Sequence, residues 1–130
     1  MTSRWKVIFE VEFDAEFQVM PEGLQDEILA HALLLKDYGP NLGRPTVDTL
    51  NGSKHSNMKE LRLNWKSGVW RVAFAFDPKR RAVLLAAVEK SGTDQKRVYK
   101  KLITVADKRY DSFLLDLFSS KKGSSYGQKS

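Results

Sequence analysis

The 130-residue sequence predicts one α+β domain built on a small antiparallel sheet. Three observations lead to this fold class. Apolar and polar residues alternate in an N-terminal segment, three more strand-like segments follow one another closely after residue 57, and helical periodicity appears on both sides of them. Helices grouped around an antiparallel meander are typical of α+β domains. A chain of this length is expected to form a single core.

The N-terminal third contains one expected strand and two expected helices. Aromatic and β-branched residues alternate with charged ones over residues 4–13, which predicts a half-buried strand. The end of that strand is left open, because acidic residues from Glu12 onward also suit the first turn of a helix. A short helix is expected over residues 14–20. A longer helix starts at Pro21, which suits the first helical position, and ends near residue 38, before a Gly-Pro pair.

The rest of the chain reads as a loop, a meander and a final helix. Residues 39–57 are rich in turn formers and are expected to be a loop. Three strands of a meander are expected at residues 58–65, 69–76 and 81–89. A last helix follows at residues 95–118. Packing both long helices on one face of the sheet leaves the other face partly open, and Arg62 and Arg71 point to that open face.

Composition excludes several classes of protein. The chain has no cysteine, which removes disulfide frameworks, thiolate metal sites and cysteine nucleophiles. Its two histidines lack a metal-ligand spacing, so neither a metal nor another cofactor is predicted. No segment has the apolar length of a membrane span or of a signal peptide, so we expect a cytoplasmic protein that does not contact membranes. Residues 1–118 are expected to form the domain, and residues 119–130 a flexible basic Ser/Gly tail.

The charge is strongly asymmetric along the chain. Residues 10–37 hold eight acidic residues and one basic residue, whereas residues 38–130 hold eight acidic and nineteen basic residues. A basic face attracts polyanions, and nucleic acid is the obvious candidate. The alternative is that the charge only keeps a small protein in solution.

The basic residues of the meander and the last helix suggest a site for a phosphodiester. Arg62 and Arg71 lie on adjacent strands, Lys90 ends the third meander strand and Tyr99 falls near the start of the last helix. Guanidinium groups bind phosphate in a bidentate manner and keep their charge. Further basic residues that are expected to contact RNA are Lys54, His55, Lys59, Lys96, Arg97, Lys100 and Lys101. The alternative is that strand faces and helix ends are basic without binding anything.

Five segments of the sequence resemble the RelE/ParE toxin superfamily, and most closely its HigB-like, phage-derived branch. They are Lys59-Glu60-Leu61-Arg62-Leu63, Gly68-Val69-Trp70-Arg71-Val72-Ala73-Phe74-Ala75-Phe76-Asp77-Pro78, Ala82-Val83-Leu84-Leu85, Lys90-Ser91-Gly92, and Lys96-Arg97-Val98-Tyr99-Lys100-Lys101-Leu102-Ile103. In that branch an "E-L-R" strand precedes a "W/Y-R-V" strand, and a "K-R-x-Y-K-K" helix start follows. The resemblance covers about residues 4–118.

The resemblance implies a RelE-like fold and the toxin half of a type II toxin–antitoxin pair. Its cognate antitoxin is then expected to be a small helix-turn-helix DNA-binding protein, and its other partners the ribosome and mRNA. The usual activity of the branch is ribosome-dependent mRNA cleavage, which inhibits translation. Arg62, Arg71, Lys90 and Tyr99 match the positions expected to be catalytic, although Lys90 stands where relatives often have arginine.

The mechanism expected from this resemblance is metal-free cleavage by the substrate's own 2′-hydroxyl, which leaves a 2′,3′-cyclic phosphate. Arg62 and Arg71 are expected to hold the phosphate, and Tyr99 or Lys90 to move protons with pKa values lowered by nearby positive charge. Two alternatives stay open: a ParE-like toxin that inhibits gyrase, and a non-catalytic basic protein that binds nucleic acid.

Overall fold

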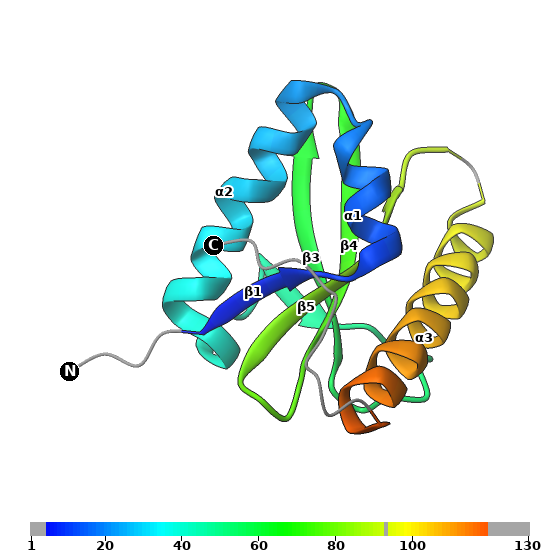
Figure 1. Ribbon diagram of the computed structural model, residues 1–130. Coiled ribbons are helices and arrows are strands. Elements are labelled where there is room, and N and C mark those ends of the chain that lie inside the picture. Colours follow the sequence, from blue (N-terminus) through cyan, green and yellow to red (C-terminus); the bar gives the residue numbers. More distant parts are fainter. Residues whose placement is uncertain (1–4, 93, 120–130) are drawn as a thin grey trace.

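The computed structural model describes residues 5–92 and 94–119 (Figure 1). Within these residues the secondary-structure elements in chain order are β1 (Lys6–Phe9), α1 (Val11–Gln18), α2 (Glu22–Tyr38), a 3₁₀ turn (Gly39–Asn41), β2 (Val47–Thr49), β3 (Met58–Trp65), β4 (Gly68–Phe76), β5 (Arg81–Glu89) and α3 (Gln95–Ser119). The meander strands and both long helices lie where the sequence predicts them. Apart from Ser119, the predicted tail lies outside the described residues.

The strands form one sheet in the order β1-β5-β4-β3-β2. The antiparallel pairs of β3, β4 and β5 make the expected meander, and the α+β fold class is confirmed. β1, however, lies parallel to β5, with Val7 opposite Ala82 and Phe9 opposite Leu84. The sheet is therefore mixed, which corrects the expectation of a purely antiparallel one. Alternation of side chains identifies a strand but carries no information about its direction.

Helices cover both faces of the sheet. α1 and α2 pack on one face, and α3 packs on the other (Figure 1). The two long helices thus do not share a face, and the face that carries Arg62 and Arg71 is not open as expected. The reason lies in the meander strands, because Ala73, Ala75 and Val83 are fully buried on the α3 side. Apolar surface on both sides of a sheet requires a cover on both sides.

The first strand is shorter than the alternating pattern predicts. β1 ends at Phe9, and the Glu10 carboxylate accepts a hydrogen bond from the backbone N–H of Phe13 at 2.9 Å, which caps α1. Phe13 and Phe17 lie one helical turn apart, and their rings pack against Phe9. Helix α1 therefore starts at Val11 and takes up the end of the predicted 4–13 strand. Phe13 continues the alternation of the strand and also fits the helical spacing, so the pattern alone did not separate the two.

The predicted loop at residues 39–57 contains an additional strand. β2 pairs antiparallel with β3, with Val47 opposite Leu61, and it forms the edge of the sheet. The backbone N–H of Arg62 also donates to the Thr46 carbonyl at 2.8 Å. A strand of three residues is too short to show a period in sequence, so the turn formers around it dominated the prediction.

Helix α3 is the longest helix, with 25 residues. Charged residues recur along it, which fits a helix with one face on the sheet and the other in solvent. Among the described helices, none combines the length and apolar character needed to cross a membrane.

Candidate active site

Arg62 and Arg71 are direct cross-strand partners on β3 and β4. The strand period places both side chains on the α3 face, because their neighbours Leu61, Leu63 and Val72 belong to the core under α1 and α2. A tight turn between β3 and β4 fixes this register. The two guanidinium groups that the sequence predicts to be neighbours therefore come from adjacent positions of the sheet.

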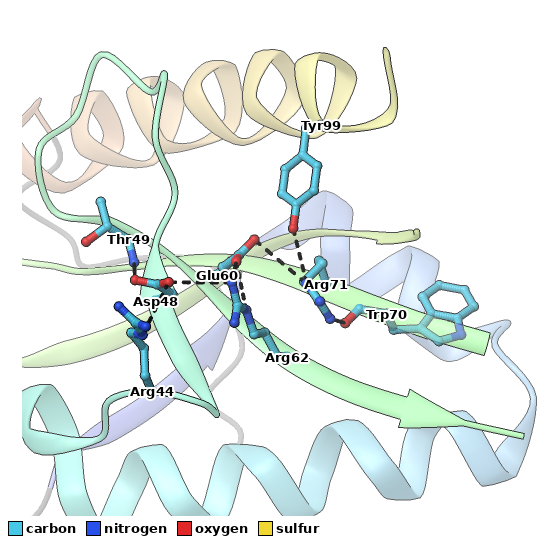
Figure 2. A network of polar contacts seen from close by, with 8 residues as sticks. All are labelled: Arg44, Asp48, Thr49, Glu60, Arg62, Trp70, Arg71 and Tyr99. Atoms are coloured by element: carbon cyan, nitrogen blue, oxygen red, sulfur yellow. Dashed lines mark hydrogen bonds and ion pairs between the residues drawn. The ribbon is translucent and has the colours of Figure 1, made fainter. Parts of the chain in front are cut away.

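A buried carboxylate, that of Glu60, lies between the two arginines (Figure 2). Its Oε2 accepts a hydrogen bond from Arg62 Nε at 2.9 Å, and Arg62 Nη2 lies at the same distance. Its Oε1 lies 3.9 Å from Arg71 Nε and has no hydrogen-bond partner in the described structure. Glu60 is only 3% exposed. One oxygen of this carboxylate is thus fully used by Arg62, and the other faces Arg71.

Tyr99 reaches the cluster from α3, the helix that covers the sheet face carrying Arg62 and Arg71. Its hydroxyl oxygen accepts a hydrogen bond from Arg71 Nε at 3.1 Å, and Arg71 Nη1 donates to the Trp70 carbonyl at 3.0 Å (Figure 2). Burial raises the pKa of Tyr99, the Glu60 carboxylate raises it further, and Arg71 acts in the opposite direction. This corrects the expectation of a lowered pKa at Tyr99. The phenol keeps its proton and is suited to donate it.

The arginine pair is partly covered and largely neutralised. Arg71 is 9% exposed beneath Tyr99, whereas the side chain of Arg62 is 34% exposed. Asp48 on β2 lies 3.5 Å from Arg62 Nη2, so two guanidinium groups face two carboxylates, those of Asp48 and Glu60. The sequence predicts an uncovered arginine surface. The structure instead gives one accessible guanidinium, one buried guanidinium and a local charge near zero.

The positive charge near Tyr99 comes from lysines around an adjacent groove. Lys90 Nζ lies over the Tyr99 ring, 5.5 Å from its centroid. A groove of about 690 Å³ runs along α3, and its lining includes Lys90, Lys96, Tyr99 and Lys100, with Gly52 and Asp107 from the loop side and the middle of the helix. This groove brings two of the predicted catalytic residues and two of the predicted RNA-binding lysines onto one surface.

Three other predicted RNA-binding residues are placed differently. The Lys54 ammonium and the His55 ring both contact the Asp111 carboxylate on α3, the ring through Nε2 at 2.8 Å. Lys59 pairs with Phe74 and lies on the opposite face of the sheet from Glu60. Lys54 and His55 thus anchor a loop to the helix, and Lys59 does not join the arginine cluster.

Arg97 and Lys101 lie on the outer side of α3. Together with Lys100 they line a shallow hollow of about 260 Å³. Lys100 lines both this hollow and the groove beside Tyr99. The first two turns of α3 therefore form a continuous basic surface.

Glu60 is the site residue that the sequence analysis did not select. Its signal was present, because Glu60 and Arg62 are two residues apart on one strand and so share a face. The sequence analysis expects the face of Arg62 to be partly open, and that expectation gives no reason to look for a buried acid there. Only the position of α3 shows that this face is buried.

The described residues contain no group of three or more histidines, aspartates or glutamates arranged to hold a metal ion. The acidic residues near the arginines, Asp48 and Glu60, are bound to guanidinium groups instead. The chemistry that the cluster offers is that of phosphate-binding cations and a phenolic proton donor.

Comparisons with known proteins identify the family and two similar relatives of this chain. Residues 15–111 match the family described as "Phage derived protein Gp49-like (DUF891)". "Putative toxin HigB3" of Mycobacterium tuberculosis (strain ATCC 25618 / H37Rv) is 48% identical over 81 residues, which cover 62% of this chain and 68% of the relative. "Putative toxin HigB2" of the same organism is 42% identical over 96 residues, which cover 72% of this chain and 47% of that relative. No solved structure matches the chain significantly.

The family model spans most of the chain, so the protein belongs to the phage-derived Gp49-like family. Its curated relatives place it with the HigB-like toxins, the toxin class of toxin–antitoxin modules, which confirms the resemblance found in the sequence. The matched region spans about two thirds of the length of one relative and about half of the other.

Proposed function

We propose that this protein is the toxin of a type II toxin–antitoxin module and that it cleaves mRNA on the ribosome. The main support is the cluster in which Arg62, Arg71 and Tyr99 meet around Glu60 beside a lysine-lined groove. The groove offers positive charge to the RNA backbone, and the cluster offers guanidinium and phenol groups to one phosphodiester. In this proposal residues 1–118 act as one toxin domain in the cytoplasm, where the ribosomes are.

The proposed reaction is an attack of the 2′-hydroxyl on the adjacent phosphorus. The P–O bond to the 5′-oxygen breaks, and the products are a 2′,3′-cyclic phosphate and a 5′-hydroxyl end. Arg62 binds a phosphate oxygen from the exposed side, and Arg71 stabilises the negative charge that develops in the transition state. Tyr99 gives its proton to the departing 5′-oxygen, because its raised pKa keeps it protonated. The 2′ proton leaves to water in the groove, with Lys90 beside the phosphate as a further cation.

Replacement of Arg71 by alanine tests the proposal. We expect the variant to cleave mRNA in a ribosome-programmed translation reaction about 10²–10³-fold more slowly, the cost of removing one donor to a transition-state oxyanion. Arg80→Ala is the matched control, since Arg80 is exposed in the turn between β4 and β5, where its guanidinium lies over the Trp5 ring. Equal growth arrest and equal cleavage by all three proteins would contradict the role of Arg71.

A second candidate is a toxin of this fold that inhibits gyrase, or a basic protein that binds nucleic acid without cleaving it. The neutralised arginines favour it, because Asp48 and Glu60 already occupy the guanidinium groups that a phosphate needs. The two candidates separate in parallel assays with the wild-type protein. An mRNA nuclease cuts ribosome-bound RNA and leaves DNA supercoiling by gyrase unchanged. A gyrase inhibitor leaves the RNA intact and blocks supercoiling, and a protein that only binds nucleic acid gives neither cleavage nor gyrase inhibition.

The proposed partner is a cognate antitoxin, a small helix-turn-helix DNA-binding protein. The chain offers it two surfaces of opposite charge: the acidic segment at residues 10–37 and the basic start of α3. Co-expression of a tagged protein with the product of the adjacent gene tests this proposal. A complex of fixed stoichiometry that abolishes growth arrest supports it, and full toxicity without a complex contradicts it.

A further inference from the structure

Glu60 is an unusual residue to find at the centre of a phosphate-binding site. A buried carboxylate is costly unless its oxygens are fully hydrogen-bonded, and it repels the substrate phosphate. Glu60 is nearly inaccessible, and only its Oε2 is bonded, to Arg62. Its buried Oε1 has no hydrogen-bond partner in the described structure. A half-satisfied buried acid of this kind calls for a role other than stability.

The surroundings of Oε1 indicate that role. Arg71 Nε lies 3.9 Å from it but donates its hydrogen bond to the Tyr99 hydroxyl oxygen instead. Because that oxygen accepts from Arg71, the hydroxyl proton of Tyr99 points away from the guanidinium. The negative charge of the Glu60 carboxylate raises the pKa of Tyr99 and so stabilises the protonated phenol, whereas Arg71 lowers that pKa and stabilises the phenolate. Glu60 and Arg71 therefore pull the proton equilibrium of Tyr99 in opposite directions.

Asp48 provides a comparison within the same network. It holds Arg62 from the exposed side at 3.5 Å, so it also places a negative charge on that guanidinium. It differs from Glu60 in making no hydrogen bond or ion pair with Arg71 or Tyr99 among the described residues (Figure 2). Loss of either carboxylate removes one of the two acidic partners of Arg62, but only loss of Glu60 changes the surroundings of Tyr99.

We propose that Glu60 is a positioning residue: its buried carboxylate aims Arg62 and Arg71 at one phosphate and keeps the Tyr99 hydroxyl as the proton donor for the leaving oxygen. Glu60 itself does not touch the RNA, because the two arginines and Tyr99 enclose it. The inference rests on the proposed function for its catalytic meaning, but the effect of Glu60 on Tyr99 exists without any substrate.

The experiment compares Glu60→Gln with Asp48→Asn in the full-length protein. Each replacement removes one negative charge and keeps the size of the side chain. Titration of Tyr99 by NMR of isotope-labelled tyrosine rings, with its signal assigned from Tyr99→Phe, reports the proton affinity directly. We expect the midpoint to move to lower pH in Glu60→Gln and to stay unchanged in Asp48→Asn. An unchanged midpoint in Glu60→Gln, or an equal shift in both variants, overturns the proposal.

A second variant covers the case in which Glu60→Gln does not fold. Glu60→Asp keeps the charge but withdraws it by one methylene, so the Tyr99 midpoint moves in the same direction by less. A folded Glu60→Asp protein, checked by circular dichroism, with the wild-type midpoint counts against the proposal.

Cleavage assays distinguish a failure of the role proposed for Glu60 from a failure of the proposed nuclease function. We expect Glu60→Gln to cleave ribosome-bound mRNA about 10–100-fold more slowly, by analogy with residues that orient the ligands of a catalytic metal. Its rate should also fall off at a lower pH than that of wild type, because Tyr99 loses its proton earlier. If Glu60→Gln shifts the Tyr99 midpoint but the wild-type protein does not cleave mRNA, the proposed function is refuted and Glu60 remains a positioning residue. Wild-type protein that cleaves, with a Glu60→Gln pH profile identical to its own, refutes the role of Glu60.

Discussion

The two faces of the sheet are built from different chemistry. On the face under α1 and α2 the contacts are almost entirely between carbon atoms, with three phenylalanine rings at the centre. On the face under α3 an apolar core shares the space with charged residues: Arg71 and Glu60 toward the start of the helix, and Asp107 and Asp111 further along it. The first face is arranged to hold the fold together. The second face gives up some packing to hold charged groups in fixed positions, as functional sites commonly do.

Within the α3 face, two polar networks anchor the same helix and differ in what they leave open. Near the start of α3 the contact between Tyr99 and Arg71 borders a groove lined with lysines. In the middle of α3, Asp107 accepts hydrogen bonds from the Ser53 hydroxyl and the Lys54 backbone, and Asp111 binds the His55 ring. In the second network Lys54 and the His55 ring both contact the Asp111 carboxylate. Asp107 also lines the groove, but the groove's lysines Lys90, Lys96 and Lys100 lie at its Tyr99 end, which is why we assign the chemistry there.

The largest effect on stability is expected from the sheet face under α1 and α2. Phe13 is fully buried among Phe9 and Phe17, so Phe13→Ala should lower the free energy of unfolding by about 3–5 kcal/mol. Urea unfolding followed by circular dichroism measures this change. Phe118→Ala is the control, because Phe118 is 71% exposed on the last turn of α3. Similar losses in the two variants would show that the comparison of the faces is wrong.

An intermediate effect is expected from the residue that links the two faces. Arg109 of α3 donates to both carboxylate oxygens of Glu16 on α1 and to the Leu85 carbonyl of β5. It also lies 4.0 Å from the buried Glu10 carboxylate that caps α1. Arg109→Met keeps much of the side-chain volume but leaves these acceptors unpaired, which costs about 1–3 kcal/mol.

The measurement for Arg109→Met is again the unfolding free energy. Arg97→Met on the exposed surface of the same helix is the control and should change it little. Arg109→Met with wild-type stability would mean that α1 and α3 are held to the sheet independently of each other.

The smallest effect is expected where α3 holds the loop before β3. The hydrogen bond from Lys54 lowers the pKa of Asp111, and His55 acts in the same direction. A lowered pKa in the folded state means that the contact stabilises above the ordinary pKa of the carboxyl and is lost as the pH falls through the lowered value. Asp111→Asn should therefore speed amide exchange at Ser53, Lys54 and His55 at neutral pH, with little change in Tm.

Hydrogen-exchange protection factors measured across pH check this prediction. Wild-type protection of the loop should fall with acid, whereas the Asp111→Asn variant should show weak protection at every pH. Asp26→Asn, a matched change on the exposed side of α2, should leave the loop as it is in wild type. Equal loop protection in Asp111→Asn and wild type would remove the reason for treating the second network as an anchor.

Much of the fold followed from local patterns in the sequence. β3 and β5 lie at the residues where alternating and continuous apolar patterns place them, and α2 begins after Pro21 as its helix-start signal indicates. Errors arose where one pattern fits two structures, as at Phe13, or where an element is too short to show a pattern, as in β2. The parallel pairing of β1 was beyond such patterns, because strand direction is set by the path of the whole chain.

The site shows the same division. The cross-strand meeting of Arg62 and Arg71 follows from the period of two and a tight turn, both readable in the sequence. Glu60 as a buried partner of those arginines, and Lys59 on the opposite face, depend on which side of the sheet each helix covers. The raised pKa of Tyr99 depends on the same fact, since it arises from burial.

The sequence by itself determined the α+β class, the meander, the long helices and which residues share a strand face, because these depend on neighbours along the chain. Only the tertiary structure decided that α3 covers the arginine face, that Glu60 joins the two guanidinium groups, and that Tyr99 retains its proton. Those properties come from the exclusion of water between segments distant in sequence, and desolvation of a charge is defined only once the segments that exclude the water are in place.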